Sequence, residues 1–222
     1  MKFYDCSTAP SPRRVRIFIA EKNIDVETIE VNLMKGEHLT PEYRAKNPNL
    51  EVPLLELENG TTIAQANAIC RYLEDIKPEN PLHGRDSIES ALVDGANTKI
   101  MLDGFMAAAE AFRNSTPGMK NRAMPGPHNY SQIPELAQRG LLRLDNFLSD
   151  LEIHFESNEY MVNDYFSVAD ISALVCIDFA KWVKKPIPEN YENLNRWYKT
   201  VSTRPSCKPV SYTHLTLPTN SG

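Results

Sequence analysis

The chain has 222 residues, 41% hydrophobic and 24% charged, which is typical of one large or two small globular domains. Its formal net charge of −5 argues against nucleic acid or an anionic membrane as the main partner, because both favour clustered basic surfaces. No stretch approaches the roughly 20 apolar residues that cross a bilayer, so we expect no membrane partner.

The first elements form a β-α-β unit. Residues 2–4 and 26–31 are short strand candidates because β-branched and aromatic residues recur in them. Between them, apolar residues at helical spacing predict a helix that begins near Ser11 or Pro12 and ends near Lys22. The length of this crossover is usual for two parallel strands.

The next elements are predicted to extend the sheet. A short helix should follow Thr40, and residues 52–57 and 61–64 should form paired strands. Asn59-Gly60 between these strands is a strong two-residue hairpin signal. A helix over residues 69–76 completes the order β-α-β, short helix, β-β-α.

Strand signals fade after this point, and the rest of the chain is predicted to be helical. Met119 to Tyr130 is rich in Pro, Gly and Asn and predicts a mobile loop. The long helical patterns cover residues 87–112, 132–155, 167–183 and 194–201. We therefore expect an α/β domain (1–77), a linker (78–86), an all-helical domain (87–209) and a disordered or non-native tail (210–222).

The cysteines indicate a reducing compartment. They are widely scattered and form neither a zinc-binding pair nor the disulfide framework of a small secreted protein. We expect a cytoplasmic protein without a metal site, in which Cys70 and Cys176 are buried as small apolar residues. The four cysteines are Cys6, Cys70, Cys176 and Cys207.

Val52-Pro53 could present a free backbone edge to a peptide. A cis bond there would expose the Val52 N–H and C=O, and an extended ligand could pair with them as an added strand. An ordinary trans proline starting an edge strand is the alternative, and from the residues alone it is the commoner state.

A second polar motif lies at a strand-to-helix junction in residues 63–69. The free N–H groups at a helix N-terminus attract a carboxylate, so Gln65 could hydrogen-bond a ligand there. Gln65 could instead cap the helix, which is the commoner role. Ser167 and Asp170 have the spacing of a capping box, which we interpret as a folding device.

Together these motifs resemble the cytosolic glutathione S-transferase family, bacterial type, over about residues 2–209. The family fold is a thioredoxin-like α/β N-terminal domain plus an all-α C-terminal helical domain, the organisation predicted above. The matching motifs are the cis-proline loop (47–54), the helix start at 63–69 with Tyr72-Leu73, the capping box at 167–170, and Arg204-Pro205-Ser206 after Trp197.

The resemblance implies a glutathione site. In it, Val52 pairs with the cysteinyl backbone, cis Pro53 is the favoured state, and Gln65 holds the γ-glutamyl end. Ala66 stands where the family usually has Ser. A hydroxyl contact to the γ-glutamyl carboxylate, of about 1.5–3 kcal/mol, is therefore lost unless Asn67 replaces it. The implied glutathione-binding residues are Glu51, Val52, Pro53, Gln65 and Ala66.

The thiol-activating residue is expected between the first strand and the first helix. A free thiol has a pKa near ~8.5, so a hydroxyl donor and a helix N-terminus would favour the thiolate. Alignment on residues 14–17 places Ala9 where many relatives carry the catalytic Ser or Cys, and Ser11 where cysteine-containing bacterial enzymes carry theirs. Ser11 is the lead, with a helix cap as its structural alternative. The other candidates are Ser7, Thr8 and Cys6, the last through a mixed disulfide, whereas Tyr4 is expected to be structural.

The resemblance also implies an apolar pocket between the domains, with Met101, Phe105 and Met106 as candidates, although such a stripe is more often core. The predicted function is a glutathione transferase of detoxification type. It would use glutathione as co-substrate, attack a small hydrophobic electrophile, and form a homodimer. The alternatives are a glutathione-dependent peroxidase or disulfide reductase, and a non-catalytic binding protein with the same fold.

Overall fold

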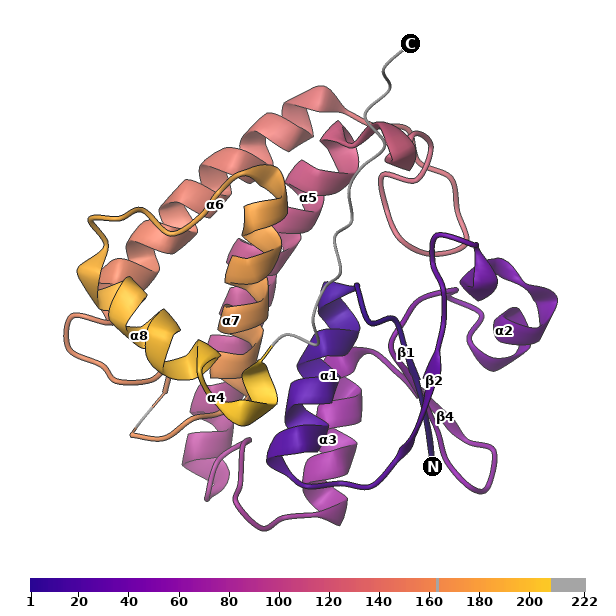
Figure 1. Ribbon diagram of the computed structural model, residues 1–222, viewed down its shortest axis with the longest axis horizontal. Helices are drawn as coiled ribbons and strands as arrows, with labels where there is room; N and C mark the ends of the chain where they lie inside the picture. Colours follow the sequence, from indigo (N-terminus) through magenta and orange to yellow (C-terminus); the bar gives the residue numbers. More distant parts are fainter. Residues whose placement is uncertain (163, 209–222) are drawn as a thin grey trace.

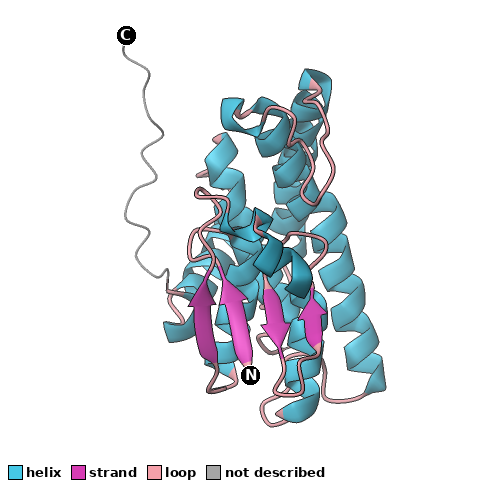
Figure 2. Cartoon of the chain, turned by 90° about the vertical axis from the view of Figure 1, so that its right-hand side faces the viewer, coloured by secondary structure: helices cyan, strands magenta, loops and turns pink. Residues whose placement is uncertain are grey.

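The computed structural model describes residues 1–162 and 164–208, so the tail predicted at 210–222 lies outside the described residues. Four strands form one mixed sheet in the order β2-β1-β3-β4 (Figure 2). β1 pairs in parallel with β2 and antiparallel with β3, which in turn pairs antiparallel with β4. The strands are β1 (Lys2–Asp5), β2 (Glu27–Glu30), β3 (Leu54–Glu56) and β4 (Thr62–Ala64).

Helices cover both faces of this sheet. α1 (Pro10–Glu21) and α3 (Ala66–Ile76) lie between the sheet and the helical half of the molecule, while α2 (Pro41–Lys46) lies on the opposite side (Figure 1). Val15 and Phe18 on α1 are fully buried, because the apolar face of the helix packs in this middle layer. α2 follows the turn η1 (Glu37–Leu39), and its cap residue Thr40 accepts a hydrogen bond from the Tyr43 N–H at 3.2 Å.

The start of α1 differs from the prediction. The helix begins at Pro10, with Ala9 as its cap residue and no side-chain cap. Pro10 fits the first helical position because its missing N–H has no partner there in any helix. Ser11 lies within the first turn, so its interpretation as a helix cap is wrong.

The second half of the described chain is helical, as predicted. Gly104 allows close approach of the helices that carry Phe147 and Cys176, because a Cβ at position 104 would lie 2.7 Å from side-chain atoms of both residues. Residues 87–112 were predicted as one helix, but they contain a π-helical segment, η2. The prediction missed this segment because hydrophobic spacing does not reveal one inserted residue. The elements are α4 (Ser87–Lys99), η2 (Ile100–Phe105), α5 (Met106–Ser115), η3 (Pro117–Met119), α6 (Pro134–His154), α7 (Val168–Ala180), η4 (Lys181–Val183), α8 (Glu192–Ser202) and η5 (Pro205–Cys207).

α7 is the central helix of this half and is buried along nearly its whole length. The predicted capping box is confirmed: Ser167 accepts from the Ala169 N–H at 3.3 Å, and Asp170 accepts from the Ser167 N–H at 3.0 Å. The buried Asp170 also accepts from the Met161 N–H at 2.9 Å and from Trp197 Nε1 at 3.0 Å. This carboxylate therefore joins α7 to α8.

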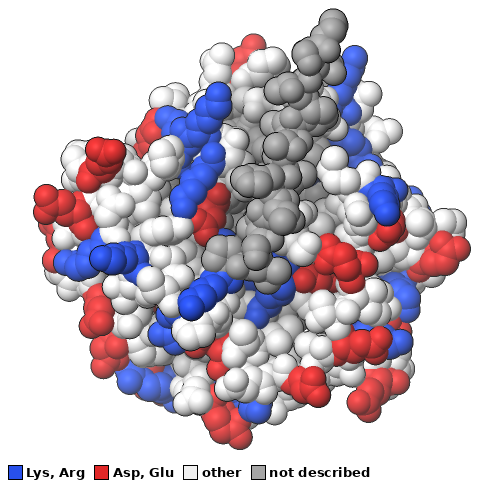
Figure 3. Space-filling model, in the orientation of Figure 1, with Lys and Arg blue, Asp and Glu red and all other residues white. Residues whose placement is uncertain are grey.

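Cys70 and Cys176 are buried, as predicted, and all four cysteines are free. Among the described residues, no helix has the length and apolar character needed to cross a membrane. Acidic and basic side chains are intermingled on the face shown in Figure 3.

Candidate functional site

A free stretch of backbone lies just before β3. The Val52–Pro53 bond is cis, as the resemblance implies. Within the described residues the Val52 N–H and C=O make no hydrogen bond. The loop is held in place because the Glu51 C=O accepts from Tyr43 Oη at 2.7 Å and from Asn47 Nδ2 at 2.8 Å. Val52 can therefore pair with an extended peptide at a fixed position.

The N-terminus of α3 lies beside this loop. Gln65 has a left-handed backbone with φ of 73°, and its Nε2 donates to Glu51 Oε2 at 2.8 Å. Gln65 is the N-cap residue of α3, as its cap interpretation expects, but its side chain makes no cap hydrogen bond among the described residues. Ala66 is the first residue of α3 and is buried. Because no side chain caps the first N–H groups of α3, they can receive a carboxylate.

The hydroxyl and thiol candidates between β1 and α1 differ in their partners. Ser7 Oγ donates to Glu30 Oε1 at 3.0 Å, and Thr8 Oγ1 lies 3.4 Å from Sγ of the buried Cys6. Ser11 Oγ accepts from Arg14 Nη2 at 3.2 Å, which leaves the Ser11 hydroxyl proton for another acceptor. Tyr4 Oη donates to Glu56 Oε2 at 2.5 Å, a sheet contact that fits its expected structural role.

Two of the three predicted pocket residues meet around one guanidinium. Arg14 Nη1 donates to Met101 Sδ at 2.9 Å, and the Arg14 Cζ lies 5.0 Å from the centre of the Phe105 ring. Met106 is 43% exposed and makes no such contact with Arg14 among the described residues. The structure thus brings Met101 and Phe105 together and places Met106 on a more exposed part of the helix.

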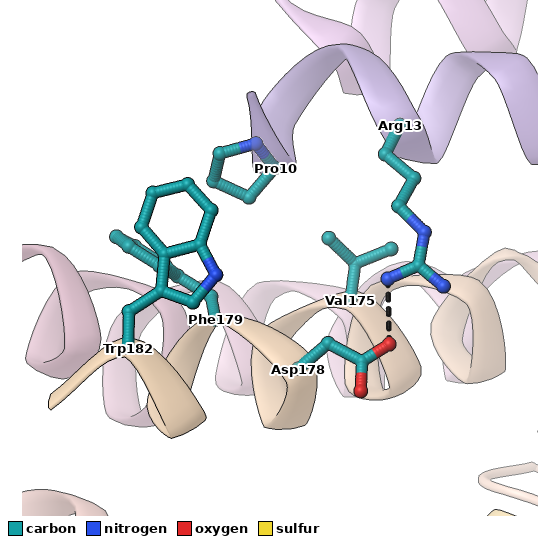
Figure 4. A pocket seen from close by; sticks show the side chains of 6 residues that line it. All are labelled: Pro10, Arg13, Val175, Asp178, Phe179 and Trp182. Atoms are coloured by element: carbon teal, nitrogen blue, oxygen red, sulfur yellow. Dashed lines mark hydrogen bonds and ion pairs between the residues drawn. The ribbon is translucent and has the colours of Figure 1, made fainter. Parts of the chain in front are cut away.

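A small cavity of about 50 Å³ separates the N-terminus of α1 from the end of α7 (Figure 4). Phe179 and Trp182 form one wall, and the Arg13–Asp178 ion pair, at 2.5 Å, forms another. Phe112 extends the aromatic wall, because its ring centre lies 5.8 Å from that of Phe179 and 5.4 Å from that of Trp182. Trp182 was missed in the sequence because only the chain topology brings it to Pro10.

A cationic cluster, also missed in the sequence, consists of His38, Arg113 and Arg122. Each has one buried nitrogen without a hydrogen-bond partner: His38 Nδ1, Arg113 Nε and Arg122 Nε. Burial lowers the pKa of His38, and the two nearby arginines lower it further. Burial also lowers the pKa of Arg113, and the negative charge of Glu51 partly opposes this shift. The lowered pKa favours the neutral ring of His38, so the positive charge of this cluster comes from Arg113 and Arg122 of the helical half, with Arg113 near Glu51 of the Val52 loop.

No group of three or more metal-ligating side chains occurs in the part of the chain that the structure describes. The site is thus composed of free backbone, a helix N-terminus, a hydroxyl next to a buried guanidinium, an aromatic wall and a cationic cluster. A free backbone edge can pair with an extended peptide, and a helix N-terminus and guanidinium groups can each receive a carboxylate.

The chain matches two family models, "Glutathione S-transferase, N-terminal domain" over residues 8–76 and "Glutathione S-transferase, C-terminal domain" over residues 138–209. It is 35% identical over 216 residues to Glutathione S-transferase 2 of Saccharomyces cerevisiae, covering 95% of this chain and 89% of the yeast protein. A crystal structure of a glutathione S-transferase domain-containing protein from Marinobacter aquaeolei superimposes with a TM-score of 0.86 at 34% identity, covering 93% of this chain and 100% of that one.

Another relative has a different name. Elongation factor 1-gamma 1 of Oryza sativa subsp. japonica is 30% identical over 190 residues, which span 84% of this chain and 42% of that protein.

Proposed function

The chain belongs to the glutathione S-transferase family, and we propose that it binds glutathione, stabilises its thiolate and directs the sulfur to a small electrophile. The observation that carries this proposal is the free Val52 backbone beside the uncapped N-terminus of α3. The two features together offer a peptide-pairing edge and a carboxylate site at one place.

Glutathione would lie along this edge in an extended form. Its cysteinyl unit would pair with Val52, and its γ-glutamyl carboxylate would meet the first N–H groups of α3 at Ala66, next to Gln65 and Glu51. The glycyl carboxylate at the other end would meet the cationic cluster, whose Arg113 lies near Glu51. Each carboxylate would then have donors suited to its charge.

Ser11 is the proposed donor to the sulfur. Ser7 donates its hydroxyl proton to Glu30, and Thr8 lies against Sγ of the buried Cys6, whereas Ser11 accepts from Arg14 and keeps its hydroxyl proton. The Ser11 hydroxyl proton would stabilise the thiolate, aided by the N-terminus of α1. The thiolate then attacks the electrophilic carbon, so that a carbon–sulfur bond forms and a leaving group departs with its electron pair. The thiol proton is released to solvent when the thiolate forms.

The electrophile would bind where the two halves meet. Met101 and Phe105 contact Arg14, which also donates to Ser11. Phe112, Phe179 and Trp182 form the aromatic wall near Pro10. Met106 is a weaker candidate because it is 43% exposed and makes no contact with Arg14 among the described residues. A small hydrophobic electrophile fits such a lining.

A homodimer and a cytoplasmic location are part of the proposal, as is the division into residues 1–77, 78–86 and 87–209. Exposed apolar side chains support the dimer: Ile88 and Leu92 on α4, Leu102 on η2 and Met106 on α5 are 71%, 52%, 56% and 43% exposed. Burial of such side chains would favour association. Light scattering of the intact chain tests it.

Retention on immobilised glutathione, followed by turnover with aryl halides and with hydroperoxides, tests the activity. The proposal expects retention and conjugation of the aryl halide. Turnover of hydroperoxides alone would favour a peroxidase or disulfide reductase. Retention without turnover would favour a binding protein, and failure of retention would reject both enzymatic functions.

A further inference from the structure

Arg14 on α1 differs from the two arginines that flank it. Arg13 pairs with Asp178 at 2.5 Å and Arg16 pairs with Asp5 at 2.5 Å. Arg14 is only 4% exposed, yet no acidic side chain in residues 1–162 or 164–208 pairs with it. A buried guanidinium ordinarily has a carboxylate partner, because an unpaired buried charge is costly.

Arg14 nevertheless remains charged. Burial lowers its pKa to about 10, which still leaves it protonated at neutral pH. The titratable groups that influence it from neighbouring helices are the thiols of Cys70 on α3 and Cys176 on α7. Burial raises the pKa of Cys70 to about 12 and raises that of Cys176 as well, so neither thiol supplies a negative charge. The positive charge is therefore uncompensated within the described chain.

The hydrogen bonds of Arg14 join two helix N-termini. Nη2 donates to Oγ of Ser11, the second residue of α1, at 3.2 Å, and Nη1 donates to Oδ1 of Asn67, the second residue of α3, at 2.8 Å. In both partners the guanidinium occupies an acceptor oxygen. The Ser11 hydroxyl proton and the Asn67 Nδ2 group have no hydrogen-bond acceptor among the described residues, so both remain available as donors.

We propose that Arg14 is a positioning residue for glutathione. This proposal rests on the proposed function. By holding the oxygens of Ser11 and Asn67, Arg14 turns the Ser11 hydroxyl proton toward the sulfur and the Asn67 amide N–H groups toward the γ-glutamyl carboxylate. Its buried positive charge is then balanced by the bound anion instead of by a protein carboxylate.

This role accounts for the alanine at position 66. A serine hydroxyl at position 66 would donate a hydrogen bond to the γ-glutamyl carboxylate. Nδ2 of Asn67, one residue further along α3, donates this bond instead. The replacement works only while Arg14 holds Oδ1, because a free Asn67 could present its oxygen to the carboxylate. A hydroxyl that accepts a hydrogen bond from a cation is also a stronger donor. The Ser11 hydroxyl therefore stabilises the glutathione thiolate more strongly.

The test compares Arg14→Met and Arg14→Lys with the wild type. Met keeps the length and apolar stem of the side chain, and it removes the desolvation cost of a buried charge that has no carboxylate partner. Lys keeps the charge but has one nitrogen for two acceptors. Arg204→Met is the matched control, because Arg204 binds Glu21 at 2.8–2.9 Å at the far end of α1. The readouts are the pKa of the bound glutathione thiol, from its thiolate absorbance, and the Kd of glutathione.

We expect R14M to raise the thiol pKa by about 1–3 pH units and to weaken glutathione binding, with R14K intermediate and R204M unchanged in both. Asn67→Leu should weaken binding about tenfold and leave the thiol pKa unchanged. A folded R14M variant with the wild-type thiol pKa and Kd would overturn the role of Arg14. If the wild type itself neither binds glutathione nor lowers its thiol pKa, the proposed function fails instead.

Discussion

Asp170→Asn is predicted to destabilise the helical half strongly. The carboxylate accepts four hydrogen bonds: Oδ1 from the Met161 N–H and Trp197 Nε1 at 2.9 and 3.0 Å, and Oδ2 from the Ser167 N–H and Oγ, both at 3.0 Å. An asparagine has one acceptor oxygen, so its NH₂ group faces two groups that were donating to the carboxylate. Each buried group left without a partner costs about 1–3 kcal/mol, which gives an expected loss of about 2–5 kcal/mol.

Urea unfolding followed by tryptophan fluorescence measures this loss. Asp86→Asn is the matched control, because Asp86 is an exposed cap that accepts from the Ile88 and Glu89 N–H groups at 2.9 Å. Asn caps helices as well as Asp does, so D86N should change the free energy of unfolding by about 0.5 kcal/mol or less. Asp170 is part of the fold and not of the glutathione site, so folded D170N should keep the wild-type Kd for glutathione. Equal stability of D170N and D86N would show that the hydrogen bonds of the Asp170 carboxylate do not stabilise the helical half.

Three further predictions concern the site and its pH dependence. Ser11→Ala should raise the pKa of the bound thiol and lower kcat/KM about 10- to 150-fold in steady-state kinetics, because a hydrogen bond to a charged group is lost. Ser202→Ala, at the end of α8, is the control and should match the wild type in the same assay. Arg113→Met should weaken glutathione binding about tenfold and leave binding of the glycyl ethyl ester unchanged in calorimetry; an equal loss for both ligands would contradict the glycyl carboxylate contact. Burial lowers the pKa of His83 to about 4 from 6.5, so the folded state resists protonation, and stability present above pH 6.5 is lost as the pH falls toward 4. The loss should reach up to about 3 kcal/mol in urea unfolding and be absent in His83→Phe, and an identical pH slope in both proteins would contradict it.

Local rules of the chain were sufficient for much of the fold. Asn59-Gly60 predicted the hairpin of β3 and β4, although its loop has three residues (58–60) and not two: the Leu57 N–H donates to the Thr61 C=O, and Gly60 has a positive φ whereas Asn59 does not. Ser167 with Asp170 predicted the start of α7. The cis bond at Pro53 followed from the family resemblance and not from the residues, which favoured trans. The α/β and all-helical halves followed from the change in hydrophobic period.

Contacts between distant segments could not be predicted in this way. Nothing local to Asp170 indicates that Trp197 will donate to its carboxylate. The cationic cluster joins His38 on the turn η1 to arginines of the helical half, so its existence depends on how the two halves pack. Gln65 occupies the N-cap position of α3, but its side chain donates to Glu51 across the loop instead of capping the helix.

A crystal structure of the chain with glutathione bound tests the proposed site most directly. We predict that the cysteinyl backbone pairs with Val52, that the γ-glutamyl carboxylate meets the first turn of α3, and that the sulfur lies within hydrogen-bond distance of Ser11 Oγ. Glutathione bound elsewhere, or a sulfur facing a side chain other than Ser11, would contradict this prediction.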